Sequence, residues 1–222
     1  GNLTGNASGT AGGLTGSPNI TINNLVGVAA TFSGVVTYED VTNIDSVGII
    51  TAQSDVSIAD KIIHTGDTNT AIRFPSADTF TVETGGSEAF RVDSSQRLIL
   101  GATSARVVGT NRQFTIEGTD SPTSSASIFR NSNDVSGGVL ALGKSRGTSD
   151  GSSTILQNGD QAGAIFFYGA DGTDAVSQAA SISAEIDGTP GSNDMPGRLV
   201  FNTTSDGASS ETERLRIDSS GR

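Results

Sequence analysis

The stretch ASISAEID, residues 180–187, decides the fold class of the chain. From Ala180 onward every second residue is apolar, and the residues between them are Ser, Glu or Asp. A period of two is that of a half-buried β-strand. The nearly continuous apolar run AIFFYG, residues 164–169, predicts a more deeply buried strand. RLVFNTT, residues 198–204, adds a third strand, so the C-terminal half is expected to be β-structure.

Residues 35–101 carry the same alternation in shorter pieces. Apolar residues two positions apart mark four of these pieces: Val56 and Ile58, Ile72 and Phe74, Phe80 and Val82, and Phe90 and Val92. Asp, Asn, Ser and Gly break the chain between them, and across the whole chain Ile and Val outnumber Leu about three to one. Short strands separated by turns predict a narrow β-stalk rather than a broad sheet.

A ten-residue sequence occurs twice. EAFRVDSSQR, residues 88–97, returns as ERLRIDSSGR, residues 213–222, with six identities. The first copy runs on into a new unit, whereas the second stops at Arg222. Because of this, and because Gly1 is not a start Met, we expect the natural chain to continue at both ends.

Three regions follow from these patterns. Residues 1–34 are rich in Gly, Asn, Ser and Thr and cannot bury enough apolar surface to fold alone. A flexible linker and a thin stalk ordered by neighbouring chains both fit this region. Residues 35–101 are expected to form the narrow β-stalk, and residues 102–222 a β-rich domain that ends in the repeat.

Composition and charge disfavour several classes of protein. The net charge is −11, and Lys61 and Lys144 are the only lysines, so the clustered basic residues that bind nucleic acid or an anionic membrane are missing. Cysteine is absent, which excludes disulfides and thiolate metal sites. No apolar run approaches the roughly 20 residues that span a bilayer. Aromatic residues are only 5 %, which suits a thin object or a core shared between chains.

The stretch GGVLALGKS, residues 137–145, contains the letters of a P-loop, from Gly138 to Gly143, Lys144 and Ser145. A P-loop needs a buried strand before the first Gly and a helix that begins at the Lys-Ser pair. Turn formers precede Gly138, and RGTSDGSS after Ser145 would break a helix. The intervening Val-Leu-Ala-Leu predicts a strand of its own. We therefore expect no nucleotide binding.

The sequence offers few catalytic candidates. His64 is the only histidine, and Ser and Asp are too abundant for a triad to stand out, so a surface or stalk histidine is the expected role. Glu185 and Asp187 share the polar face of one strand, and glycosidases use two carboxylates within an aromatic-lined cleft. The scarcity of aromatic residues favours a solvated strand face. We predict no catalytic residue and no enzymatic activity.

Four aspartates in Gly-rich turns carry the oxygen ligands that suit Ca²⁺: Asp171, Asp174, Asp187 and Asp194. None of them matches an EF-hand loop, and Asp and Gly also populate turns for conformational reasons. We therefore predict no metal site and no cofactor, although the turns leave Ca²⁺ open. The N-x-[ST] triplets are those expected by chance from this composition: Asn2, Asn6, Asn19 and Asn202.

Several stretches taken together resemble fibre proteins on the virions of tailed bacteriophages, especially phages of marine cyanobacteria. The stretches are GNLTGNASGTAGGLTG (1–16), ATFSGVVTYEDVTNIDSVGIITA (30–52), FRVDSSQRLILG (90–101), GADGTD (169–174), DGTPGSNDMPGRLVFNTTSDG (187–207) and ERLRIDSSGR (213–222). The resemblance implies a parallel homotrimer of intertwined β-structure, without a cofactor and usually without catalysis in the shaft. In proteins of this kind ERLRIDSSG often precedes a C-terminal trimerisation or self-cleaving chaperone module. The resemblance carries over no functional residue.

Residues and resemblance together predict an all-β fold with essentially no helix. It consists of an elongated, intertwined, trimeric β-stalk, triple β-helix-like, followed by a β-sandwich-like or β-prism domain. The expected function is that of a structural fibre protein in a phage virion, in a tail fibre or a neck whisker, which positions or performs host attachment. The expected partners are further copies of the chain, other tail or neck proteins, and a host-surface glycan or protein. A trimeric polysaccharide depolymerase and a secreted bacterial adhesin module are the alternatives.

Overall fold

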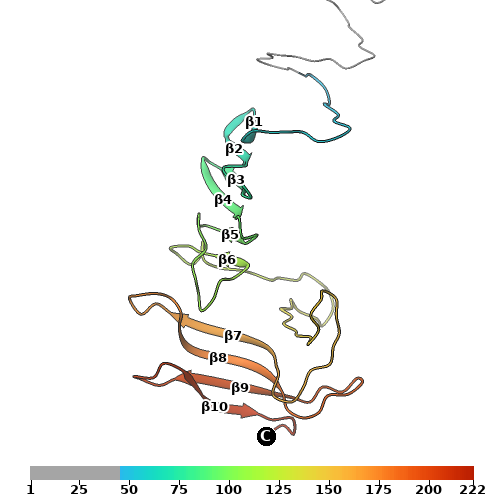
Figure 1. Ribbon diagram of the computed structural model, residues 1–222, viewed down its shortest axis with the longest axis vertical. Coiled ribbons are helices and arrows are strands. Elements are labelled where there is room, and N and C mark those ends of the chain that lie inside the picture. The colour runs from blue at the N-terminus through green and yellow to red at the C-terminus, as the bar shows by residue number, and fades with distance from the viewer. Residues whose placement is uncertain (1–45) are drawn as a thin grey trace, which may run out of the picture. The chain divides into compact units, whose positions relative to one another are not determined.

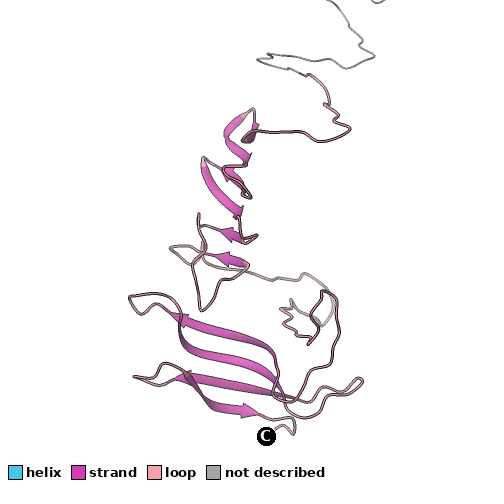
Figure 2. Ribbon diagram, viewed as in Figure 1, coloured by secondary structure: helices cyan, strands magenta, loops and turns pink. Residues whose placement is uncertain are grey.

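The computed structural model describes residues 46–222, so the expectations for residues 1–34 and for the first part of the stalk, 35–45, lie outside the described residues. Residues 56–222 form one unit, separate from residues 1–55. The ten strands found among residues 46–222 all lie in the unit 56–222, and the described residues contain no helix (Figure 2). Accordingly, no helix in that part of the chain is long and apolar enough to cross a membrane. The expected all-β class is confirmed.

The first sheet has six short strands that follow one another in chain order (Figure 1). They are β1 (Lys61–His64), β2 (Asp67–Arg73), β3 (Phe80–Thr84), β4 (Ser87–Val92), β5 (Leu98–Leu100) and β6 (Phe114–Ile116). Neighbours pair antiparallel, except that β6 lies parallel to β5. Gly85 and Gly86 form the two-residue turn between β3 and β4, with φ values of 59° and 76° that a tight hairpin turn requires.

One face of the first sheet carries an apolar row that crosses all six strands. Residues opposite one another in register share a face, and the row follows from the printed pairs: Ile62, Ile72, Val82, Phe90, Leu100 and Ile116. We call it the first apolar row. Phe80 adds aromatic contacts beside it, with its ring centroid 6.1 Å from that of Phe74 and 6.3 Å from that of Phe90.

The opposite face of the first sheet is charged, yet it is the better buried of the two. Thr81 and Ile99 lie there and are 1 % and 0 % exposed. Arg73 bridges Asp60 and Glu83, and Arg91 pairs with Glu88. The long aliphatic stems of arginine cover the surface beneath them while the guanidinium groups stay paired, so this face is sealed by its own side chains.

The second sheet has four longer antiparallel strands in the order β10-β9-β8-β7 (Figure 1). They are β7 (Gln161–Gly169), β8 (Ser177–Ile186), β9 (Gly197–Thr204) and β10 (Glu211–Ile217). The strands predicted from residues 164–169, 180–187 and 198–204 are therefore confirmed, with ends shifted by at most three residues.

The second sheet repeats the arrangement of faces found in the first. A row of apolar residues crosses it in register, and we call this the second apolar row: Ile165, Ile182, Phe201 and Leu215. Ile165 and Leu215 in it are 47 % and 57 % exposed. On the other face Ser181, Ser183 and Val200 are buried. Ile186, at the end of β8, also lies on the apolar face and is 1 % exposed, but along the rest of both sheets the apolar face is the more open one.

The sequence repeat is also a structural repeat. In each copy a strand, β4 or β10, leads into a turn that begins at an aspartate. Asp93 Oδ1 accepts hydrogen bonds from the second and fourth backbone amides beyond it at 2.9 and 3.0 Å, and Asp218 Oδ1 does so at the same two distances. The fourth residue of each turn, Gln96 or Gly221, has a positive φ of 62° or 78°.

Several details of the expected strands are wrong. Residues 139–142 form no strand but lie in the long connection between β6 and β7, where Val139, Leu140 and Leu142 are exposed. Residues 56–58 form no strand either. The run at 164–169 is not deeply buried: Ile165, Phe166 and Phe167 are 47 %, 38 % and 49 % exposed, although Leu142 of the β6–β7 connection lies against Gly163 just before the run. Period-two alternation and β-propensity indicate that a segment can form a strand. They do not determine whether a neighbouring strand is available to pair with it or to cover it.

The C-terminal region also differs from one of its two expected forms. Within residues 102–222 the strands are β6, which joins the first sheet, and the single sheet β7–β10. A β-sandwich needs two facing sheets, so this form is wrong for one chain. A β-prism needs three copies and stays a prediction, as do the region boundaries at residues 34 and 101.

Candidate functional site: a groove at the strand ends

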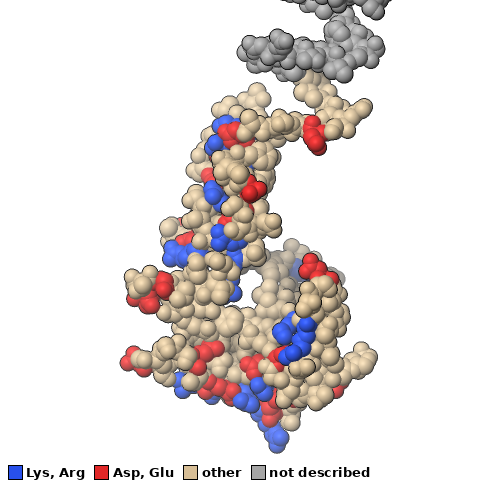
Figure 3. All heavy atoms as spheres, in the orientation of Figure 1, with Lys and Arg blue, Asp and Glu red and all other residues tan. Residues whose placement is uncertain are grey.

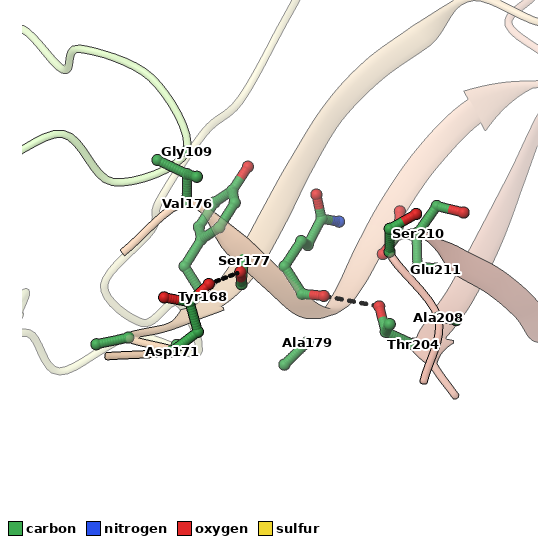
Figure 4. Close-up of a pocket in the computed structure, with 14 residues that line it drawn as sticks. Gly109, Tyr168, Asp171, Val176, Ser177, Ala179, Thr204, Ala208, Ser210 and Glu211 are labelled. Atoms are coloured by element: carbon green, nitrogen blue, oxygen red, sulfur yellow. Dashed lines mark hydrogen bonds between the residues drawn. The ribbon is translucent and has the colours of Figure 1, made fainter. Parts of the chain in front are cut away.

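A groove of about 730 Å³ lies where β7 ends and β8 begins, and it continues to the end of β9 and the start of β10. We call it the strand-end groove. Figure 4 shows Tyr168 at one end of the groove and Ser210 with Glu211 at the other. Strand ends with their loops are where a rigid sheet can hold side chains in fixed positions for a ligand.

The loop between β7 and β8 owes its shape to Asp171. Its Oδ1 accepts hydrogen bonds from the backbone amides of Thr173 (2.8 Å) and Asp174 (3.1 Å), and its Oδ2 accepts one from the Ser177 hydroxyl (2.9 Å). These hydrogen bonds, led by that from Thr173, hold the pKa of Asp171 below its usual range. Gly172, with a φ of 96°, makes the turn possible. One wall of the groove is thereby fixed.

The second wall is tied to β8 by a side chain from β9. The Thr204 hydroxyl donates a 2.7 Å hydrogen bond to the backbone carbonyl of Gln178 (Figure 4). The β9–β10 turn follows, with Gly207 at a φ of 75° and a backbone hydrogen bond from Ala208 to Ser205. The turn brings Glu211 back across the sheet toward β8.

Tyr168 supplies an aromatic ring at the other end of the groove. Gly109 lies against it so closely that a Cβ there would come within 2.3 Å of the ring. The guanidinium carbon of Arg112 lies 5.9 Å from the ring centroid, within cation–π range. Phe166, two residues earlier on β7, is 6.1 Å away between centroids. These three contacts fix the orientation of the ring.

Two polar atoms in the groove residues lack a partner among the described residues. They are Gln178 Nε2, a donor, and Glu211 Oε2, an acceptor, and both are buried. The other oxygen of Glu211 accepts a 2.9 Å hydrogen bond from Ser181, which in turn accepts one from Asn202 at 3.0 Å. A buried polar atom without a partner is costly, so such atoms in native structures call for an explanation.

Residues 138–145, which match the P-loop sequence pattern, do not form a P-loop. Residues 138–145 contain no strand or helix, and no helix follows Ser145. Lys144 Nζ lies 3.5 Å from Asp160 Oδ2, and the Ser145 hydroxyl accepts hydrogen bonds from the amides of Gly147 and Thr154. The side chains that a nucleotide would need are engaged with the protein itself.

The structure gives Glu185 and Asp187 a common partner. Arg198 donates to Glu185 from Nε at 3.0 Å and to Asp187 from Nη1 at 3.1 Å. The backbone amide of Ser219 also donates to Asp187, and these contacts lower the pKa of that carboxyl. Glu185 and Asp187 are thus brought together, but as an ion-paired group on the strand face rather than as a free acid and base. Figure 3 shows acidic and basic side chains next to one another on the surface.

The remaining candidates are not brought together. Among the described residues no group of three or more His, Asp or Glu side chains lies in metal-binding proximity. Asp171 and Asp174 share one turn, whereas Asp194 belongs to the turn at Gly191. His64 is exposed at the end of β1. The Asn202 amide is bound to Ser181, and Asn2, Asn6 and Asn19 lie outside the described residues.

Sequence reasoning identified Asp171 but missed the other groove residues, Tyr168, Gln178 and Glu211. Tyr168 was visible only as the end of an apolar run, and Gln178 and Glu211 lie 33 positions apart in unremarkable polar surroundings. Their proximity depends on strand register, for which the sequence carries no local signal.

The chain shares its fold with part of a bacteriophage appendage. The carboxy-terminal domain of the bacteriophage T5 L-shaped tail fibre matches with a TM-score of 0.53 and 19 % identity, over 71 % of this chain and 72 % of that one. The same domain with its intra-molecular chaperone domain matches equally, over 50 % of that longer chain. No protein-family model and no curated protein matches the chain. At 19 % identity the likeness establishes the fold.

Proposed function

We propose that the chain is a structural fibre protein of a phage virion. It forms a homotrimer and positions or performs attachment to the host cell surface, in a tail fibre or a neck whisker beside other virion proteins. The observation that carries the proposal is the inverted burial of both sheets, in which the charged face is closed and the apolar face is open. The shared fold with a tail-fibre domain and the resemblance of the sequence to fibre proteins support the same assignment.

The first apolar row is left partly open by residues 46–222 and needs a partner to cover it. Ile62 and Ile72 in this row are 50 % and 38 % exposed, and Phe74 beside it is 42 % exposed. Completing the burial of each such side chain is worth about 1 kcal/mol. Three copies that turn this face toward a common axis would bury the rows against one another, as the expected triple β-helix-like stalk requires.

The second sheet points to the same solution. Phe167 and Ile217 flank its apolar row and are 49 % and 47 % exposed. The buried apolar residues of the described part are few, namely Ala71, Ile99, Leu156, Ile186 and Val200. A core this small does not stabilise a domain alone, but three open sheets facing one axis can share a core, as in a β-prism.

The connection between β6 and β7 supports shared folding. Residues 117–160 contain no strand or helix, and a loop of that length without structure of its own is uncommon in a compact domain. Phe129 and Val135 in it are 82 % and 105 % exposed. Contacts with neighbouring copies would give this segment the cover that its own chain leaves out.

Two proposals concern what the chain does on the virion. We propose that it has no catalytic activity and no cofactor, because its most prominent carboxylates, Glu185 and Asp187, are held by Arg198. We also propose that attachment is polyvalent, since three copies per fibre multiply weak contacts. The resemblance to fibres of marine cyanobacterial phages makes those hosts the first to test.

The test is the molar mass of the 222-residue chain in solution, measured by size-exclusion chromatography coupled to light scattering. A particle near three times 22.4 kDa that resists SDS without heating is the expected result. A compact monomer would refute the homotrimer and reopen the adhesin alternative. Release of reducing sugar from host polysaccharide by the purified trimer would refute the non-enzymatic role and favour a depolymerase.

A further inference from the structure

We propose that the strand-end groove is a binding site for a neutral saccharide. The inference deepens the proposed attachment role, on which it rests, by naming the site and the chemical class of the ligand. It stands on the two unpartnered polar atoms, on the oriented ring of Tyr168 and on the charge of the groove.

The unpartnered atoms complement a hydroxyl-rich ligand. Gln178 Nε2 can only donate a hydrogen bond and Glu211 Oε2, when ionised, can only accept one. A sugar hydroxyl does both, so adjacent hydroxyl groups can satisfy the two atoms together. Both residues line the groove, and we expect their side chains to rotate on binding so that the two atoms reach the ligand. Ligand binding would then offset the cost of leaving these two buried polar atoms without a partner in the free protein.

Tyr168 supplies the apolar part of such a site. The face of a pyranose ring carries C–H groups that pack on an aromatic ring, while the edges carry hydroxyl groups. Because Gly109 and Arg112 fix the tyrosine ring, little side-chain freedom is lost on binding. The volume of about 730 Å³ lies within the range of small-molecule sites and suits one or two sugar units.

Charge decides between classes of ligand. The residues that line the groove include Asp171 and Glu211 and no Lys or Arg. Acidic sugars, phosphates and nucleic acids would meet the like charges of Asp171 and Glu211 in a chain whose net charge is −11, and the nearby guanidinium of Arg112 is engaged with the Tyr168 ring. An apolar ligand would leave the buried polar atoms unpaired. A neutral saccharide avoids both penalties.

The experiment is ligand-observed saturation-transfer NMR on the full chain. The neutral probes are lactose, maltose, cellobiose, mannobiose and diacetylchitobiose, and the charged comparators are sialyllactose and glucosamine. We expect at least one neutral disaccharide to bind with millimolar affinity. Glu211→Gln and Gln178→Ala should each weaken binding about tenfold, as should Tyr168→Ala, whereas Tyr168→Phe should largely restore it.

Gln161→Ala is the matched control, because Gln161 is exposed at the opposite end of β7 and should leave binding unchanged. Circular dichroism checks that each variant is folded. Absence of neutral binding, equal binding by all variants, or binding of glucosamine or sialyllactose alone would overturn the inference. Light scattering on the same samples separates the two proposals: a trimer that binds no sugar refutes the groove alone, and a monomer refutes the fibre.

Discussion

The two sheets contain the same strand-and-turn repeat but place it in different surroundings. In the first sheet β4 lies between two neighbours, and Asp93 at its turn is buried and paired with Arg97. In the second sheet β10 is an edge strand, and the turn at Asp218 is held instead by Asp187, which accepts the amide of Ser219. The ten residues therefore dictate their own backbone, while burial and pairing depend on the neighbours.

The sheets also differ in what seals their polar faces. Ion pairs of Arg73 and Arg91 cover the short strands of the first sheet. In the second sheet a hydroxyl–amide–carboxylate chain through Ser181 joins three strands, next to the Arg198 ion pairs. The strand-end groove of about 730 Å³ lies at the ends of the longer strands, whereas the groove at the ends of β2 and β4 is smaller, about 460 Å³. We propose a binding role for the second sheet and a spacer role for the first.

A charge on the second apolar row should have the largest effect. Leu215→Asp would bury three carboxylates near the proposed axis, at a cost of several kcal/mol for each. We expect loss of the trimer in light scattering. Ser153→Asp, at an exposed loop position, should leave the trimer intact. A trimeric Leu215→Asp chain would show that this row does not face the other copies.

Replacing one buried isoleucine in each sheet with alanine compares how much the two cores contribute to the free energy of unfolding. Ile99 and Ile186 are 0 % and 1 % exposed, and replacing either with Ala should cost about 2–5 kcal/mol in the free energy of unfolding. Urea unfolding of both variants measures the losses. If the two sheets unfold together, each variant shows a single unfolding transition with a lower urea midpoint than the parent chain. Two transitions, each moved by one substitution only, would show that the sheets are independent.

Replacing the aspartate that begins the turn should lower the free energy of unfolding by different amounts in the two copies of the repeat. Asp93→Ala removes two amide contacts and the pair with Arg97, and should cost about 2 kcal/mol. Asp218→Ala removes the corresponding amide contacts at a more exposed turn and should cost about 1 kcal/mol. Thermal unfolding of the two variants checks the order. Equal losses would contradict the view that the neighbours set the energetic role of the repeat.

The smallest effect expected is an acid-dependent one. The hydrogen bond from Arg97 lowers the pKa of Asp93 below its unfolded value of about 3.9. The folded state then binds protons less readily than the unfolded state, so this stabilisation is complete above about pH 4 and is lost as the pH falls through the folded pKa. Melting temperatures between pH 7 and pH 2 should fall less steeply for Asp93→Asn than for the parent chain. An unchanged slope would refute this contribution.

The sequence by itself determined the elements that depend on local order. Period-two alternation located the strands at 180–187 and 198–204, a continuous apolar run located the strand at 164–169, and the repeat at 88–97 and 213–222 indicated one shared strand-and-turn unit. Scarce lysine and absent cysteine restricted the chemistry. Such features are local because they follow from backbone geometry and from the charge that each residue carries wherever it lies.

Only the tertiary structure decided which face of each strand is closed. Alternation says that Ser181 and Ile182 point to opposite sides, but the neighbours in register bury the serine and leave the apolar side open. Register likewise brought Gln178 and Glu211 to one groove and left residues 139–142 without a strand partner. Burial and proximity are properties of pairs of segments, and in a chain with so small a core they depend on what lies next to each face.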